Sequence, residues 1–370
     1  MFDEMSSAKR RVLFGVRGGV VAGLTAAAIA ATALAGCGNQ AATSGSAAGS
    51  APVEQAAAIK EVSESGKDRT VKNADGADVT VKGEVKKVAV TDQGYADAVE
   101  LLSGGKIDSV VVANADEAKS ADAQLAFGPA GAFDAADLES AGVTFVSLPA
   151  ATSLEALEAN YQTMGDALGD NGSARAKELV SFTKDQAETV KKLSAKKSFE
   201  ANAVVLSVEN GKYYVAGNDT FAGSALEVAG LTNAAAGYTN DSKSADGTMS
   251  EISADDLVNM NPKFIFTLDQ KAYDAALKDT AISKKVVGVK SWVAQQGTMR
   301  PIPTGESSWA SGSVESCLLP AFYAHVAFAD VYDGEYDMEQ TVKDFYKTFY
   351  NKKLSTHDAE SIITGATDAR

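Results

Sequence analysis

A long helical stretch lies between two regions in which short apolar strands alternate with helices, and this order restricts the fold most. Apolar residues recur at helical spacing over residues 154–168 and again over 173–195, after a break at 169–173. Ser173 is placed to cap the second helix, which would be roughly 33 Å long, about the diameter of a small domain. The pattern predicts one rigid helix that bridges two α/β lobes.

The region before this helix shows the signals of a hairpin followed by a βαβ unit. Residues 70–81 alternate apolar and polar side chains around the turn dipeptide Asp75-Gly76. Strands are predicted at 85–91, 107–113 and 143–148, and helices at 95–102 and 137–140. Residues 114–137 give no clear pattern.

The region after the helix repeats this alternation without a tandem repeat. Strands at 204–208 and 212–215 flank Asn210-Gly211, a strong hairpin signal. The remaining predictions are helices at 222–229, 252–260, 314–331 and 338–350, a buried strand at 264–268 and a proline-containing edge strand at 299–303.

Length and charge limit the class of protein. A chain of 370 residues with 45% hydrophobic content can form two domains. The 34 basic residues are outnumbered by 49 acidic ones and are scattered along the chain, so nucleic acid is not an expected partner. Cys317 lies in an apolar stretch and is interpreted as a buried free thiol.

The N-terminus is interpreted as an export signal. Basic residues Lys9 to Arg11 precede an apolar run that ends at Leu34-Ala35-Gly36-Cys37, and a tether rich in Ser, Ala and Gly follows. This order resembles the signal peptide of bacterial lipoproteins, which implies cleavage before Cys37 and lipidation of its thiol. The predicted divisions are a signal peptide (1–36), a lipidated cysteine and tether (37–67), an N-terminal lobe (68–172), the bridging helix (173–197) and a C-terminal lobe (198–370).

Several short sequence segments resemble those of the iron-complex and cobalamin class (class III) of solute-binding proteins of ABC importers. They occur in the order of that family: 69–81, 86–90, 154–168, Tyr214-Val215-Ala216-Gly217, Phe221, 226–230 with Asn233, Ile252-Ser253, Leu257, Asn261-Pro262, 345–350 and Leu354-Ser355. The usual glutamate-led helix and Pro-Asp strand are not evident between residues 114 and 142. The resemblance implies two α/β lobes, each a β-sheet flanked by helices, joined by one long rigid helix, with a solute held between them.

The resemblance also implies a function outside the cytoplasm and a set of partners. The expected protein is a monomeric lipoprotein, anchored to the cell membrane through Cys37, that delivers a small molecule to an ABC permease and its ATPase. It is not expected to be an enzyme or to carry a cofactor. Glu227 matches a position at which the family presents an acid to the permease, although a merely solvated glutamate is the alternative.

Loops at strand ends supply the expected ligand contacts, with aromatic walls and a few orienting polar groups. Arg300 could pair with carboxylates or with oxygen donors around a ferric centre. The predicted ligand-binding residues are Gln93, Tyr95, Tyr214, Asn218, Phe221, Arg300, Ser308 and Trp309.

The resemblance implies a ferric siderophore-like chelate or a related large macrocycle as the ligand. Two histidines also cannot supply a site for bare zinc or manganese. Haem, bound through a tyrosine or His325, and cobalamin are alternatives within the same fold. An exported hydrolase and a protein-binding surface lipoprotein are the alternatives from other classes, although no nucleophile elbow or metal-binding helix is present.

Overall fold

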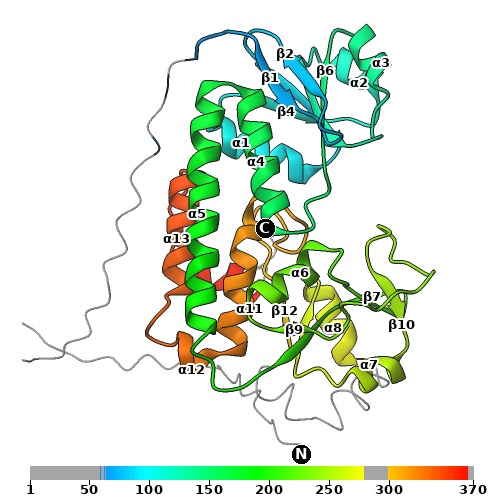
Figure 1. The fold of residues 1–370 in the computed structure, drawn as a ribbon, viewed down its shortest axis with the longest axis vertical. Coiled ribbons are helices and arrows are strands. Elements are labelled where there is room, and N and C mark those ends of the chain that lie inside the picture. The colour runs from blue at the N-terminus through cyan, green and yellow to red at the C-terminus, as the bar shows by residue number, and fades with distance from the viewer. Residues whose placement is uncertain (1–58, 60–61, 63, 279–298, 366–370) are drawn as a thin grey trace, which may run out of the picture. The chain divides into compact units, whose positions relative to one another are not determined.

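The computed structural model describes residues 59, 62, 64–278 and 299–365, which form two lobes built on separate sheets (Figure 1). The predicted signal peptide and Cys37 lie outside the described residues, as does most of the predicted tether. The described residues belong to one compact unit. Among them, no helix is long and apolar enough to cross a membrane.

The first lobe opens with the predicted hairpin. Strands β1 (Arg69–Lys72) and β2 (Asp78–Val81) pair antiparallel. Gly76 has a φ of +81°, a backbone conformation that glycine adopts without steric cost. The Asp75-Gly76 turn is thus confirmed.

A four-stranded parallel sheet forms the centre of the first lobe, in the order β4-β3-β5-β6. Its strands are β3 (Lys87–Val90), β4 (Asp108–Val111), β5 (Leu125–Pro129) and β6 (Thr144–Leu148). The helices between them are α1 (Gln93–Ser103), α2 (Ala115–Ser120) and α3 (Ala135–Ser140). The predicted strands and helices of this lobe are confirmed within a few residues.

The stretch without a clear pattern contains α2 and the central strand β5. Residues 125–128 are buried, and β5 pairs with a strand on each side. A fully buried strand lacks polar–apolar alternation, and here it also ends in Gly128-Pro129, which are typical of turns.

The bridging helix is confirmed as α5 (Asp170–Ser194), but it begins three residues earlier than predicted. Gly169 is its N-cap, whereas Ser173 lies inside the helix and donates its hydroxyl to Asp166 Oδ1 at 2.5 Å. Ser173 as N-cap was therefore wrong. With 25 residues, α5 is about 37 Å long.

A close glycine contact joins α5 to the preceding helix α4 (Leu154–Leu168). A Cβ at Gly165 would lie 2.6 Å from the carbonyl oxygen of Gly172 and 2.4 Å from Ala176 Cβ. Because neither glycine carries a side chain, the two helices approach closely at the corner.

The second lobe contains a six-stranded sheet in the order β10-β8-β7-β11-β12, with β9 also paired to β7. Its strands are β7 (Asn202–Glu209), β8 (Lys212–Val215), β9 (Thr232–Asn233), β10 (Ser250–Ile252), β11 (Phe264–Thr267) and β12 (Met299–Pro301). The Asn210-Gly211 hairpin is confirmed, with positive φ at both residues. The edge strand is also confirmed, because β12 pairs only with β11 among the described strands.

Helices α6 (Phe221–Val228), α7 (Ala254–Met260) and α8 (Gln270–Lys278) connect these strands. One boundary differs from the prediction. Ile252 ends β10, and α7 begins only at Ala254 because Ser253 caps it by accepting from Asp256 N.

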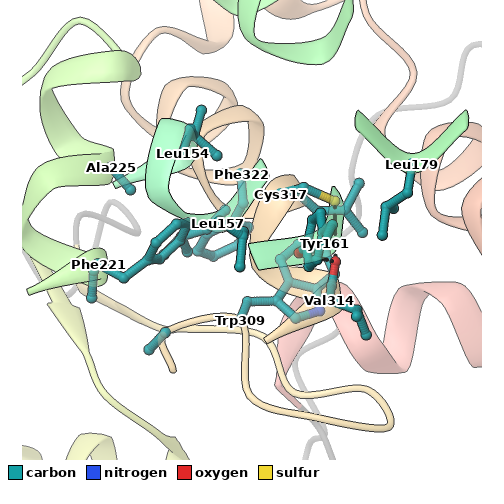
Figure 2. Close-up of a cluster of buried hydrophobic side chains, with 14 of the residues drawn as sticks. Leu154, Leu157, Tyr161, Leu179, Phe221, Ala225, Trp309, Val314, Cys317 and Phe322 are labelled. Carbon is teal, nitrogen blue, oxygen red and sulfur yellow. Dashed lines mark hydrogen bonds between the residues drawn. The ribbon is translucent and has the colours of Figure 1, made fainter. Parts of the chain in front are cut away.

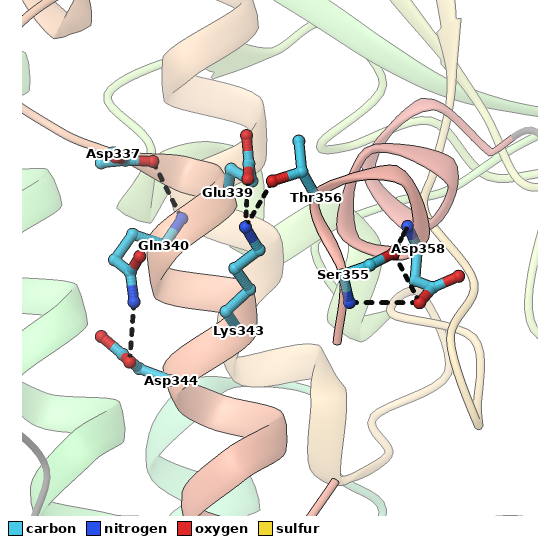
Figure 3. A network of polar contacts seen from close by, with 8 residues as sticks. All are labelled: Asp337, Glu339, Gln340, Lys343, Asp344, Ser355, Thr356 and Asp358. Atoms are coloured by element: carbon cyan, nitrogen blue, oxygen red, sulfur yellow. Dashed lines mark hydrogen bonds and ion pairs between the residues drawn. The ribbon is translucent and has the colours of Figure 1, made fainter. Parts of the chain in front are cut away.

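The C-terminal part is more broken than the predicted helices. Residues 314–331 form a 3₁₀ turn η1 (Val314–Leu318), α11 (Leu319–Ala327) and the start of α12 (Ala329–Tyr332). Two further helices follow, α13 (Met338–Phe349) and α14 (Thr356–Thr364), of which α14 was not predicted. Figure 3 shows polar contacts at this end, where Lys343 of α13 bonds to Glu339 and to Thr356, and Ser355 and Asp358 form a capping box.

The C-terminal helices lie alongside α5, so the bridging helix does not stand alone (Figure 1). Phe182 of α5 packs against Phe345 and Phe349 of α13. Arg175 of α5 donates to the carbonyl oxygens of Leu101 in the first lobe and Phe349 in α13, at 2.6 and 2.7 Å. The largest cluster of buried apolar residues extends from the first lobe through these helices into the second.

Candidate functional site

The strand order of the first parallel sheet switches at β3. The next strand along the chain, β4, pairs with one side of β3, and the following strand, β5, pairs with its other side. At such a switch point, the loops that follow the carboxyl ends of the parallel strands form the usual ligand crevice of an open α/β sheet. The loop after β3 begins at Thr91 and packs tightly against the end of β5, because a Cβ at Gly128 would lie 2.6 Å from Thr91 Cγ2.

Two predicted ligand residues belong to this loop. Gln93 is exposed at the start of α1, and Tyr95 is half-buried in its first turn. Burial raises the pKa of Tyr95 to about 12, so its hydroxyl remains protonated at neutral pH and can donate a hydrogen bond.

Gln93 also has a partner that the sequence did not reveal. Its side-chain amide donates to Asp97 Oδ1 at 2.7 Å, and Asp97 is buried on the same helix. Burial raises the pKa of Asp97, whereas the bond from Gln93 lowers it. The bond orients the Gln93 side chain toward α1.

In the second lobe, β8 leads through a short loop into α6. Tyr214 and Phe221 are both buried and pack in the main core. Asn218 is half-buried between them and is held by hydrogen bonds to Asn233 and Glu227. Glu227 itself is exposed on α6.

Of the other three predicted ligand residues, Arg300 lies in β12, and Ser308 and Trp309 lie in the loop after it. Arg300 and Ser308 are half-buried, but Trp309 is completely buried. Figure 2 shows the Trp309 ring within the buried cluster that contains Leu157, Tyr161 and Phe322. In this structure Trp309 therefore fills the core.

A buried glutamate anchors this loop, and its position was not anticipated. Glu315 accepts hydrogen bonds from Trp309 Nε1 at 2.9 Å, Tyr346 OH at 2.8 Å and Glu306 N at 3.0 Å. Desolvation raises the pKa of Glu315 to about 7, although the three donors favour the ionised form. A lone acid within the apolar stretch 314–322 was the only sequence signal of this role.

The same loop joins the two lobes. Tyr161 of α4 donates its hydroxyl to the carbonyl oxygens of Ser313 at 2.9 Å and Val314 at 3.1 Å. Gly312 lies so close to Ala151 that a Cβ would approach the Ala151 carbonyl oxygen to 2.9 Å. Nearby, Ser224 of α6 donates to the carbonyl oxygen of Thr152 at 2.6 Å, so α6 also contacts the first lobe.

Two cavities of about 500 and 330 Å³ lie in the described part of the chain, away from the predicted ligand residues. The larger is lined by Arg69, Lys86 and Ser103 among others, and the smaller by Leu101, Arg175 and Phe349 among others. None of the eight predicted ligand residues lines either cavity.

The structure also places the cysteine and the two histidines of the described residues. Cys317 is a buried free thiol, as predicted, and burial raises its pKa. Burial lowers the pKa of His325, whereas His357 is exposed on α14. Within the described ranges, no three His, Cys, Asp or Glu side chains are grouped so as to hold a metal ion.

Comparison with known proteins found a partial match to one family and several solved structures with a similar fold. Residues 128–291 match the family model described as periplasmic binding protein. A solved periplasmic solute-binding protein from Veillonella parvula is 19% identical, with a TM-score of 0.63 over 81% of this chain and 99% of the other. The family model covers less than half of the chain, and the similarity to the solved structure shows that the fold is shared.

Two other solved structures share this fold. The molybdate-binding protein MolA from Haemophilus influenzae is 13% identical, with a TM-score of 0.63 over 78% of this chain and 99% of the other. A protein of an Fe³⁺-hydroxamate transport system from Saccharomonospora viridis is 18% identical, with a TM-score of 0.52 over 70% and 98% of the two chains. No curated protein matches the sequence significantly.

Proposed function

We propose that this chain is the periplasmic solute-binding lipoprotein of an ABC importer and that it captures a ferric siderophore-like chelate between its lobes. The observation that carries the proposal is the parallel sheet whose strand order switches at β3, together with α5, which joins this lobe to a second α/β lobe. The ligand would be contacted by Gln93 and Tyr95 at the start of α1, by Arg300 in β12 and by Ser308 in the following loop.

The chemistry of the exposed and half-buried residues favours a chelate over a bare ion. A chelate satisfies the coordination of iron with its own oxygen atoms, so the protein needs only hydrogen-bond donors and a cation. Gln93, Tyr95 and Ser308 can donate, and Arg300 can pair with several oxygens at once. The structural similarity to the Saccharomonospora viridis protein, which is named for Fe³⁺-hydroxamate transport, supports this class.

Direct titration tests the ligand class. The protein from residue 38 onward would be titrated with ferrioxamine B, haemin, cyanocobalamin and molybdate by calorimetry. We expect saturable binding of ferrioxamine B, at least tenfold weaker in Arg300→Gln, with exposed Lys271→Gln on α8 as the matched control. Binding of haemin or cobalamin alone would reassign the ligand. If none of the four binds, transport of this ligand class is excluded, and a hydrolase or protein-binding role would be tested next.

The proposed anchoring is tested separately. Lipidation at Cys37 would retain the protein on the membrane, and Cys37→Ser would abolish incorporation of labelled fatty acid and release the protein. The native protein would be a monomer in size-exclusion chromatography. Membrane retention of the serine variant would contradict the lipid anchor.

Glu227 is the proposed contact with the permease because its carboxylate is exposed on α6. Glu227→Lys should impair uptake of ferric hydroxamate by cells while the purified variant still binds it. Glu188→Lys, at an exposed position on α5, is the matched control. Unchanged uptake by Glu227→Lys would remove this assignment.

A further inference from the structure

A chain of three side chains joins the loop before α6 to the exposed surface of that helix. Asn233 Nδ2 donates to the carbonyl oxygen of Ala216 at 3.1 Å and to Asn218 Oδ1 at 2.8 Å. Asn218 Nδ2 in turn donates to Glu227 Oε1. Asn233 is 3% exposed and Glu227 is exposed, so the chain runs from the interior to the surface.

The backbone determines the direction of this chain. Asn233 Oδ1 accepts from Ala235 N at 2.9 Å, while its Nδ2 faces the carbonyl oxygen of Ala216. The Asn233 amide therefore has one orientation that satisfies both groups. Asn218 must then present its oxygen to Asn233 and its amino group to Glu227.

The loop at residues 216–220, here called the α6 loop, is packed rigidly on the first turn of α6. A Cβ at Gly223 would lie 2.0 Å from the Gly217 carbonyl oxygen and 3.0 Å from Asn233 Nδ2. Thr220 donates to Gly217 O at 2.8 Å and caps the helix by accepting from Gly223 N at 3.1 Å. Because this packing is tight, a displacement of Glu227 can be transmitted through Asn218 to the α6 loop.

We infer that Asn233 is a positioning residue that aligns the α6 loop with Glu227 through Asn218. A cationic partner that pairs with Glu227 weakens the bond from Asn218 and thereby loosens the α6 loop. Docking at the surface of α6 and release of the ligand are coupled in this way. The inference rests on the proposed function, in which Glu227 contacts the permease, and on the prediction that Asn218 of the α6 loop contacts the ligand.

A double-mutant cycle tests the hydrogen-bonded contact between Asn218 and Glu227 without any ligand. Asn218→Asp keeps an acceptor for Asn233 but places a second carboxylate oxygen against Glu227. We expect about tenfold faster hydrogen exchange at the backbone amides of residues 217–221. In the double variant with Glu227→Gln, the introduced glutamine amide can turn and donate to the new carboxylate, which should restore exchange to within about threefold of wild type.

The controls separate this contact from general effects of charge. Asn259→Asp, at an exposed position on α7, should leave exchange at residues 217–221 unchanged. Glu227→Gln alone keeps an acceptor for Asn218 and should speed exchange less than Glu227→Ala. Additive effects of Asn218→Asp and Glu227→Gln, with no rescue, would contradict the inference that these hydrogen-bonded side chains position the α6 loop.

The coupling to ligand is measured with ferrioxamine B. Glu227→Ala should weaken its binding by about three- to tenfold, although Glu227 lies on the outer face of α6, and exposed Glu188→Ala should not. Equal affinities of wild type and Glu227→Ala would overturn the coupling. If wild type fails to bind ferrioxamine B, the proposed ligand is wrong, and the exchange cycle alone decides whether Asn218 couples the α6 loop to Glu227.

Discussion

The indole N–H of Trp309 donates to Glu315 Oε2 at 2.9 Å, and neither side chain is exposed to solvent. This bond closes the loop after β12 onto η1. Tyr161 of the first lobe holds the same loop by its bonds to Ser313 and Val314. Glu315 thus anchors the loop that Tyr161 of the first lobe contacts.

Removal of the Glu315 carboxylate should strongly destabilise the protein. Glu315→Leu leaves the donors of Trp309, Tyr346 and Glu306 buried without their acceptor, which costs roughly 3 kcal/mol or more in the free energy of unfolding. Glu315→Gln keeps one acceptor oxygen and should lose less. Urea denaturation at pH 8 measures both, with exposed Glu188→Leu as control. A loss below about 1 kcal/mol for Glu315→Leu would show that the network contributes little.

Stability should also depend on pH through Glu315. Its pKa rises from 4.5 to about 7 on folding, so between these values the folded state binds more protons than the unfolded state. The part of the stability that comes from proton binding by this group is therefore full below pH 4.5, declines as pH rises to about 7, and is then absent, while the hydrogen bonds to the carboxylate remain. The difference in urea midpoint between wild type and Glu315→Gln, followed from about pH 5 to 8, should show this decline. A difference that stays constant would place the pKa of Glu315 outside this window.

Trp309 should behave spectroscopically as a core residue. The chain contains two tryptophans, so Trp292→Phe leaves Trp309 as the single fluorophore. Its emission should be blue-shifted and resist quenching by iodide, because the ring is fully buried. Red-shifted, readily quenched emission would instead favour the sequence-based prediction that Trp309 forms an accessible ligand wall.

The end of the tether should stabilise α5. Gly169 offers no side-chain cap, but Glu64 accepts from Asp170 N and Asn171 N, both at 2.9 Å. A carboxylate at a helix N-terminus satisfies free N–H groups and interacts favourably with the helix dipole. Glu64→Ala should cost about 1 kcal/mol of unfolding free energy, as for other lost caps.

Thermal unfolding of Glu64→Ala, Glu64→Gln and a control would check this cap. Glu64→Gln keeps an acceptor and should lose only part of the stability. Glu84→Ala, at an exposed position before β3, should change it little. Equal stability of Glu64→Ala and wild type would show that water replaces the cap without loss.

Local patterns in the sequence determined much of the fold. The Asp75-Gly76 and Asn210-Gly211 turns, the edge strand before Pro301 and the long helix all follow from constraints within a few residues. Glycine and asparagine adopt positive φ, proline leaves a sheet ladder incomplete, and apolar side chains repeat at helical spacing. Such constraints act on the chain before it folds.

Only the tertiary structure decided which candidate side chains are accessible and what they contact. Trp309 is enclosed because Tyr161, Phe322 and Glu315 come together from distant segments, and β5 is recognisable as a central strand only from its two neighbours. Asn218, Asn233 and Glu227 likewise meet only through the packing of α6 against the α6 loop. Burial and hydrogen-bond partners depend on contacts between residues far apart in sequence, so a local pattern cannot specify them.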